Sequence, residues 1–401
     1  MIMNGVQGAN PFKLLMVVGS ANDIFVYNMA KWLKKSMDIQ IDIYEFYPSN
    51  QQGYSNEYYD CVESAPHCNI KYLRIFVNPI IQGRSLDRYL KNKHYDAIHL
   101  HWMTPSTVMA KSYKQHCRKL YATFWGGEFD NLTLLMSNRL YQKRLTSLAN
   151  DIDCIVNSPT FERNILQNLP SYNGTFYSGK FGSAPLECLY QLVGTENKEQ
   201  SKAKLSFPTD KISVMLGYSG KRLHRHIDIV KELSKHNNLK TKIHLFAPMT
   251  RGADSTYVEM LEEELRDSGY SYTIFKGNFL TDEEVARIRN ATDIALQLSA
   301  FDGFSRSVVE CLCAKSILLY GNWLGYHTYM TEEQFQGIEV QSIHQAITIL
   351  PEIIDNIKDY RKMTESNYEN GKTHNLWSSC IQDWVKAYRI VNNLPNNVEI
   401  C

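Results

Sequence analysis

Short apolar runs alternate with helix-like segments along nearly the whole chain. In the first half, the apolar runs predict strands at residues 12–18, 41–46, 70–76 (the weakest pattern), 95–101, 119–125 and 153–158. In the second half, they predict strands at 211–220 (ending in a glycine turn), 242–248, 272–277, 293–299 and 316–321. Because parallel strands need helical crossovers, this alternation indicates parallel sheets with helices on both faces.

The alternation breaks over a stretch rich in glycine, serine, proline and charge, where we place an interdomain linker at 181–209. The chain has 401 residues, more than one hydrophobic core usually holds. We therefore expect an α/β fold with a Rossmann-like, doubly wound domain at 1–180 and a second at 210–374, facing across a cleft. A last amphipathic helix at 375–393 is a candidate to pack back on the first domain.

Composition narrows the class of protein. The charge is nearly balanced, with 43 Lys and Arg against 42 Asp and Glu, so a nucleic-acid partner is not expected. The nine cysteines form no CxxC pair, so neither a zinc site nor a disulfide framework is predicted.

No apolar stretch approaches the ~20 residues that span a bilayer and no signal-peptide pattern is seen, so we expect a cytoplasmic protein. A basic cluster at Lys31, Lys34 and Lys35 leaves open a peripheral contact with the inner face of the plasma membrane.

The strongest candidate site is the segment FDGFSRSVVE, which follows a predicted strand and enters a predicted helix. It carries two carboxylates eight positions apart. Asp302, at the loop, is suited to accept sugar hydroxyls, and Glu310, in the helix, is suited to accept both hydroxyls of a ribose.

The start of the same helix offers an anion site. Gly303 lets a ligand approach the backbone closely. We expect the amides of Phe304, Ser305 and Arg306 in the first helical turn, where a helix N-terminus favours a diphosphate. The segment therefore predicts a site for a nucleotide sugar.

This segment resembles the E-x7-E signature of retaining family 4 glycosyltransferases, which have the two-domain GT-B fold. Asp302 stands where that signature has its first Glu. The resemblance implies transfer of a sugar from a nucleotide-sugar donor, which is a substrate, with retention of configuration and no cofactor. A weaker resemblance, scattered over 100–330, links the chain to transferases that add 4-acetamido-4,6-dideoxygalactose in enterobacterial common antigen synthesis.

A second candidate site is the segment LGYSGKR. Gly217 and Gly220 allow a turn where a predicted strand ends, with Ser219 between them. Lys221 and Arg222 offer a point charge and a planar fork to a diphosphate. In the resembled family, a glycine turn followed by basic residues contacts the leaving diphosphate at this place. Since no D-x-D motif lies in a suitable loop, we expect these cations to act without a metal.

Further candidates lie in the first domain. The segment YDAIHLH resembles the D-x-[IV]-H-x-H segment of family 4 enzymes, whose second histidine lies near the reacting sugar. This makes His101 the candidate on the acceptor side. Glu128, in WGGEFD, is a candidate to orient or deprotonate the acceptor hydroxyl. Gly19, in the first strand-to-helix loop, occupies the place that faces the donor diphosphate in GT-B enzymes.

Together these features predict a hexosyl-type glycosyltransferase that acts on a glycan or lipid-linked acceptor in surface polysaccharide biosynthesis. Two alternatives stay open. A sugar-nucleotide epimerase shares the fold and the donor but needs no acceptor. A non-catalytic GT-B binding or scaffold protein would bind the nucleotide sugar without consuming it.

Overall fold

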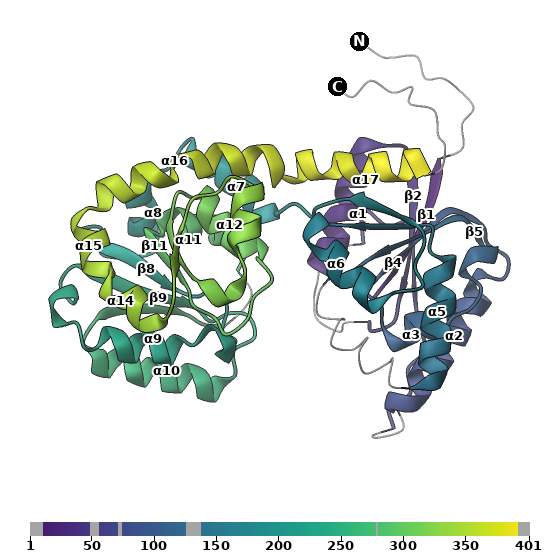
Figure 1. Cartoon of the computed structure of the whole chain (residues 1–401), viewed down its shortest axis with the longest axis horizontal. Coiled ribbons are helices and arrows are strands. Elements are labelled where there is room, and N and C mark those ends of the chain that lie inside the picture. Colours follow the sequence, from purple (N-terminus) through teal and green to yellow (C-terminus); the bar gives the residue numbers. More distant parts are fainter. Residues whose placement is uncertain (1–10, 49–55, 71–73, 126–137, 278–279, 392–401) are drawn as a thin grey trace, which may run out of the picture. The chain divides into compact units, whose positions relative to one another are not determined.

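A computed structural model divides the chain into two compact α/β units (Figure 1). Unit 1 comprises Met1–Phe181 with Cys380–Cys401, and unit 2 comprises Gly182–Ser379. Each unit has its own hydrophobic core around one parallel sheet. The structure describes residues 11–48, 56–70, 74–125, 138–277 and 280–391.

Unit 1 is a doubly wound sheet with the order β3-β2-β1-β4-β5-β6-β7, and all its described neighbours run parallel. β1 and β4 are buried along nearly their whole length, as parallel strands covered on both faces should be. The strands are β1 (Phe12–Val18), β2 (Ile39–Glu45), β3 (Cys61–Ser64), β4 (Tyr95–His101), β5 (Cys117–Thr123), β6 (Cys154–Asn157) and β7 (Thr175–Ser178). Its helices include α1 (Ile24–Ser36), α2 (Arg74–Leu90), α3 (Pro105–Met109), α5 (Arg139–Asp151) and α6 (Pro159–Asn168).

Unit 2 repeats this winding with the order β10-β9-β8-β11-β12-β13, again in parallel. Its strands are β8 (Ile212–Leu216), β9 (Ile243–Pro248), β10 (Ser271–Phe275), β11 (Ile294–Gln297), β12 (Ile317–Gly321) and β13 (Ile338–Val340). Its helices include α7 (Ala184–Val193), α8 (Lys198–Lys204), α9 (His226–Leu233), α10 (Ser255–Ser268), α11 (Asp282–Ala291), α12 (Arg306–Cys313), α13 (His327–Glu332), α14 (Ile343–Thr348), α15 (Leu350–Asp355) and α16 (Ile357–His374). The expected fold class, two Rossmann-like sheets in series, is confirmed.

The prediction of a strand at 70–76 is wrong, because 74–76 begin helix α2. The strand that precedes α2 in the chain is β3, which is four residues long. α2 has a buried face that includes Leu86 and Leu90, four residues apart. The apolar run at its start was therefore the first turn of a helix rather than a strand.

The segment expected as a linker, 181–209, is structured instead and belongs to unit 2 from Gly182 onward. It contains α7 and α8. The side chains of Ser183 and Asn197 accept backbone N–H groups at the first turns of these helices. The polar and charged residues that suggested a linker are therefore helix caps and helix surface.

The C-terminal helix α17 (Trp377–Val391) begins in unit 2 and continues into unit 1, as expected for a helix that returns to the first domain (Figure 1). Within unit 1 it is anchored by two fully buried aromatic side chains. The Trp384 indole N–H donates to the carbonyl of Lys180 at 2.8 Å. The Tyr388 hydroxyl lies 2.6 Å from Nδ1 of His99 on β4.

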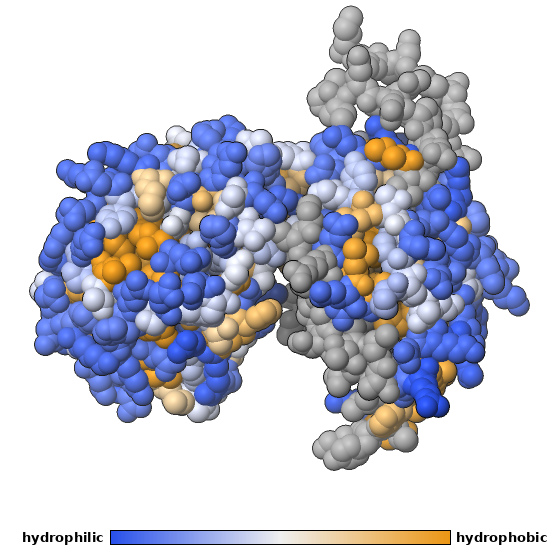
Figure 2. Space-filling view, in the orientation of Figure 1, coloured by the Kyte–Doolittle hydropathy of each residue, from blue (hydrophilic) through white to orange (hydrophobic). Residues whose placement is uncertain are grey.

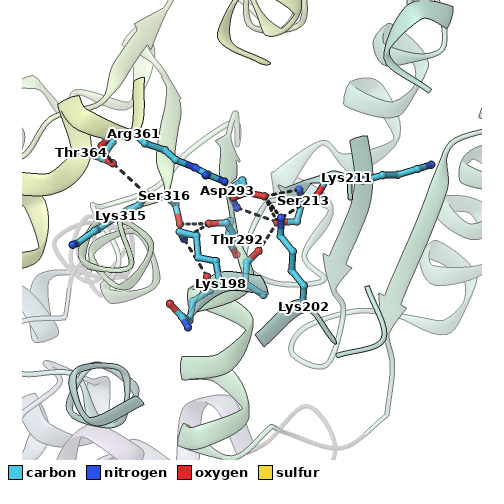
Figure 3. Close-up of polar contacts among 12 residues, drawn as sticks. Lys198, Lys202, Lys211, Ser213, Thr292, Asp293, Lys315, Ser316, Arg361 and Thr364 are labelled. Atoms are coloured by element: carbon cyan, nitrogen blue, oxygen red, sulfur yellow. Dashed lines mark hydrogen bonds and ion pairs between the residues drawn. The ribbon is translucent and has the colours of Figure 1, made fainter. Parts of the chain in front are cut away.

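A cluster of buried charges fixes the edge of unit 2 at which β8 and β11 begin (Figure 3). The fully buried carboxylate of Asp293 pairs with Lys202 and with Arg361, each at 2.5 Å. Burial raises the pKa of Asp293, but the neighbouring charges of Lys202, Lys198 and Arg361 outweigh burial and hold the pKa below its usual value. Nζ of Lys198 donates to three backbone carbonyls at 2.8–3.1 Å. The cluster ties α8 and α16 to the sheet.

The lysine cluster at the end of α1 is partly engaged within unit 1. Lys34 pairs with Asp60 at 2.6 Å, and the ammonium of Lys35 lies 4.7 Å from the ring centroid of Trp32. None of the helices in the described ranges is both long and apolar enough to cross a membrane. The cytoplasmic location stays a prediction.

Candidate functional site

The winding of each sheet reverses beside its first strand, between β1 and β4 in unit 1 and between β8 and β11 in unit 2. Ligands of open α/β sheets bind at the carboxyl ends of the strands at such a point. In unit 2, the loops that leave β8 and β11 meet there. The N–H of Ala300 donates to the carbonyl of Leu223 at 2.8 Å, and that of Gly217 donates to the carbonyl of Leu296 at 3.1 Å. The two strongest sequence segments are therefore brought together.

Three donors hold the carboxylate of Asp302 at the centre of this site. The Tyr218 hydroxyl donates to Oδ1, the Tyr326 hydroxyl donates to Oδ2, and the N–H of Ser305 donates to Oδ2 at 3.1 Å. Burial, reinforced by the charge of Asp302, raises the pKa of both phenols, so both stay protonated donors. A carboxylate offers about four acceptor positions, and with three taken about one remains for an outside hydroxyl.

The loop after Asp302 differs in detail from the expectation. α12 begins at Arg306 with Ser305 as its N-cap, so Phe304 lies outside the first helical turn. Phe304 has a left-handed φ of 58°, and its buried ring stacks on Tyr329 with 4.8 Å between centroids. Phe304 can therefore offer a ligand only its backbone. A Cβ added to Gly303 would meet no atom within 4 Å, so the loop is open to a ligand at this point.

Two further side chains predicted to contact the donor are engaged inside unit 2. The buried carboxylate of Glu310 pairs with Arg289 at 3.1 Å and accepts the Ser183 hydroxyl at 2.7 Å. Arg306 donates to the side-chain carbonyl of Asn375. Donor contact by Glu310 stays a prediction, and the ion pair with Arg289 gives its carboxylate a fixed direction.

The loop after β8 has the shape that its glycines suggested. Gly217 has a φ of 63°, which strains any other residue. A Cβ at Gly220 would lie 2.3 Å from the Cβ of Ala253, so the loop packs tightly on its neighbour. The Ser219 hydroxyl lies 2.9 Å from Nε2 of His224. Burial lowers the pKa of His224 to about 4, so this pair is neutral near pH 7.

Lys221 and Arg222 differ in their availability to a ligand. They lead into a short 3-10 turn rather than a regular helix. Arg222 makes two hydrogen bonds to Asp254, at 3.1 and 3.2 Å, and its guanidinium lies 4.7 Å from the Tyr257 ring centroid. Within the described residues, the ammonium of Lys221 has no such partner. Because the exposed Arg222–Asp254 pair is weak, a phosphate can compete for Arg222.

In unit 1, His99 and His101 lie on the same face of β4 with their rings stacked at 4.2 Å. The Thr123 hydroxyl donates to the carbonyl of Val156 at 2.8 Å, so Nε2 of His99 must supply the proton in its 2.8 Å contact with Thr123. Nδ1 then accepts the Tyr388 hydroxyl. His99 is thereby fixed as one neutral tautomer.

His101 is buried at the carboxyl end of β4 and has no such partners. Burial lowers its pKa to about 3, and neither ring nitrogen has a hydrogen-bond partner in the described part of the chain. The next residue, Trp102, has a strained φ of 77° and accepts the Thr107 hydroxyl through its carbonyl at 3.0 Å. Such strain clusters at functional sites. A neutral imidazole whose two buried nitrogens lack a partner among the described residues can exchange a hydrogen bond with a hydroxyl group that reaches it.

The remaining candidates of unit 1 are only partly placed. Gly19 follows β1 at the carboxyl edge, and a Cβ there would meet no atom within 4 Å. Its carbonyl accepts the N–H of Tyr47 at 2.8 Å. Glu128 lies outside the described residues.

Sequence reasoning missed the residues that hold the carboxylates of unit 2. Tyr218 stands inside the LGYSGKR segment and Tyr326 inside the loop GNWLGY, but tyrosines are common in this chain. Arg289 lies on another helix, far from Glu310 in sequence. Among the described residues, no three His, Cys, Asp or Glu side chains are grouped as a metal site needs. Metal independence stays a prediction.

Comparison with known proteins bears on the fold. Neither a family model nor a curated protein sequence matches the chain. Among solved structures, it is similar to sucrose-phosphate synthase from Thermosynechococcus elongatus, at 13% identity and a TM-score of 0.71 over 95% of this chain and 99% of that one. The chain has the GT-B fold.

Two other structures support the same fold. WaaG, a glycosyltransferase involved in lipopolysaccharide biosynthesis, is 13% identical with a TM-score of 0.66, over 94% of this chain and 99% of that one. HepE of Anabaena, in complex with UDP-glucose, is 12% identical with a TM-score of 0.64, over 94% of this chain and 98% of that one. At such identities, the GT-B fold is what the likeness shows.

Proposed function

We propose that this protein is a glycosyltransferase that moves a sugar, of the hexosyl type, from a nucleoside-diphosphate sugar to a glycan or lipid-linked acceptor. One observation carries the proposal. In unit 2, the loops that meet where the sheet reverses carry the held carboxylate of Asp302, the open backbone at Gly303, the start of α12 and Lys221. The carboxylate of Asp302 can accept hydrogen bonds from sugar hydroxyls. The backbone N–H groups of the loop and helix start, with the charge of Lys221, can bind a diphosphate.

The chemistry of the site fits departure of a nucleoside diphosphate. In this proposal, Lys221 and the N–H groups at the start of α12 stabilise the negative charge of the leaving group. The held Asp302 orients the sugar. We extend the proposal to metal-independent transfer with retention, as in the family that the sequence resembles. The proposal also includes surface polysaccharide biosynthesis, supported by the described role of WaaG.

On the acceptor side, the proposal assigns His101 to the acceptor hydroxyl. Because its imidazole is neutral and has no partner in the described part of the chain, it can accept or donate a hydrogen bond. We expect His101→Ala to leave donor binding intact and to reduce transfer strongly. A loss of donor affinity in that variant would remove His101 from this role.

Thermal unfolding tests the donor part of the proposal. The melting temperature is measured with UDP, GDP, TDP, CMP and their sugar conjugates, with and without EDTA, starting from UDP-glucose because the similar HepE structure holds it. A ligand at a hundred times its Kd stabilises the native state by about 2.7 kcal/mol. One nucleoside diphosphate that raises the melting temperature regardless of EDTA supports the proposal. A rise with none of them overturns it.

Turnover separates the proposal from its two alternatives. A transferase releases nucleoside diphosphate faster when an acceptor glycan is added. An epimerase converts the sugar of the nucleotide without an acceptor, and a binding or scaffold protein leaves the nucleotide sugar intact. The open loop at Gly303 and the ammonium of Lys221, which has no partner among the described residues, are common to all three, so product analysis decides among them.

A further inference from the structure

Helix α2 of unit 1 carries an apolar surface that no part of the described chain covers. Phe76 is 72% exposed, Ile80 is 37% exposed and Ile81 is 38% exposed. Ile70, whose carbonyl accepts the first N–H of the helix at 3.1 Å, is 60% exposed. Large contiguous apolar patches are rare on soluble proteins and mark sites of interaction. We call Ile70, Phe76, Ile80 and Ile81, with Arg74, Arg84 and Arg88, the α2 patch.

The opposite face of α2 shows that this exposure is not a packing defect. Asn78 and Gln82 are buried there, and both side chains are satisfied. Gln82 donates to the carbonyl of Phe46 at 3.0 Å and accepts the Ser106 hydroxyl at 2.6 Å, while Asn78 accepts the N–H of Cys68 at 2.8 Å. The buried face of the helix therefore holds two amides beside Leu86 and Leu90, while isoleucines and a phenylalanine remain exposed on its other side.

The exposed charges that α2 itself carries are basic. Arg74, Arg84 and Arg88 are exposed. The acid on this helix, Asp87, already accepts the N–H groups of two residues beyond α3, at 2.8 and 3.0 Å. Glu63 and Arg88 both lie near the Tyr44 hydroxyl, so Glu63 compensates part of the charge of Arg88. Arg74 and Arg84 therefore carry the least compensated charge of the three arginines. Figure 2 shows orange atoms beside deep-blue atoms at the lower end of unit 1, where Figure 1 places α2.

We infer that the α2 patch docks unit 1 on an anionic lipid surface. Apolar side chains beside arginines fit the boundary between acyl chains and phosphate headgroups, where the apolar groups enter the bilayer and the guanidiniums bind phosphate. A neutral protein partner would not use the arginines. In the lysine cluster of α1, by contrast, Lys34 and Lys35 are engaged by Asp60 and Trp32. The inference stands without the proposed sugar transfer.

Vesicle co-sedimentation of the full chain tests the inference. The probes are vesicles of phosphatidylcholine alone and of phosphatidylcholine with phosphatidylglycerol, each at low and high salt. The wild type is expected to sediment with the anionic vesicles only, and less at high salt. Phe76→Ser with Ile80→Ser is expected to abolish binding. Arg74→Gln with Arg84→Gln is expected to weaken it on the order of thirtyfold, from about 1 kcal/mol for each arginine.

The matched control lies on α10 of unit 2, where Met260 is 45% exposed and the Arg266 side chain is 65% exposed. Met260→Ser with Arg266→Gln should bind vesicles like the wild type. Circular dichroism and the urea midpoint establish that each variant is folded. Absence of wild-type binding to anionic vesicles, or equal binding by the patch and control variants, overturns the inference. Dimerisation that is lost in Phe76→Ser, without vesicle binding, would show that a second copy covers the patch instead.

Discussion

Tyr326→Phe removes one of the three donors that hold Asp302 and leaves the shape of the site nearly unchanged. The Tyr326 side chain is fully buried, and its hydroxyl also receives a hydrogen bond from Gln297 at 3.2 Å. A hydrogen bond to a charged group contributes about 1.5–3 kcal/mol. If Asp302 orients the donor sugar, this free energy should be lost from recognition of the sugar and not from recognition of the nucleotide.

Calorimetry with UDP and UDP-glucose, or with the pair that the thermal panel selects, measures this difference. We expect the Kd for the sugar nucleotide to rise by a factor on the order of ten to a hundred in Tyr326→Phe, while the Kd for the nucleoside diphosphate is unchanged. Tyr360→Phe is the control, because that hydroxyl lies on the surface and binds only Glu352, at 3.0 Å, among the described residues. Equal losses for both ligands, or no loss for either, would refute the assignment of Asp302 to the sugar.

Three other predictions follow from the described contacts. Asp293→Asn, which leaves buried cations unpaired, should lower the free energy of unfolding in urea by about 3–5 kcal/mol, whereas Asp254→Asn, in an exposed pair, should change it far less. His101 takes up its proton near pH 6.5 in the unfolded chain but only near pH 3 in the folded one. The free energy of unfolding should therefore fall by ~1.4 kcal/mol for each pH unit as the pH drops through this window. His101→Gln should remove this contribution to the pH dependence of stability. Gly220→Ala, whose new methyl group would meet Ala253, should shift the loop and weaken nucleotide binding with a smaller effect on the urea midpoint; unchanged nucleotide affinity would show that the loop is not part of the site.

Much of the fold was accessible from the sequence because parallel strands are continuously apolar. The strands at Phe12–Val18 and Tyr95–His101 were predicted with their observed bounds. The capping box of α11 also has a visible sequence pattern, Thr281 followed three residues later by Glu284. The prediction failed at 70–76, where a short apolar run cannot distinguish a strand from the first turn of a helix.

For the candidate site, the sequence predicted which loops meet more than how their side chains are held. Strand ends, glycines and acids located the loops at Gly217 and Asp302, because such loops share one edge of a parallel sheet. The partners of these residues were not predictable from local pattern. Tyr326 reaches Asp302 from a loop 24 positions away, and Arg289 reaches Glu310 from another helix. Only the packing of unit 2 brings these pairs together.

The most direct test of the central claim is a crystal structure of the protein with the nucleoside diphosphate that stabilises it most. We expect the diphosphate in unit 2, within hydrogen-bond distance of Nζ of Lys221 and of the N–H groups at the start of α12. We also expect Asp302 to keep its bonds to Tyr218 and Tyr326. A nucleotide bound anywhere else, without contact to Lys221 or the loop at Gly303, would contradict the proposed function.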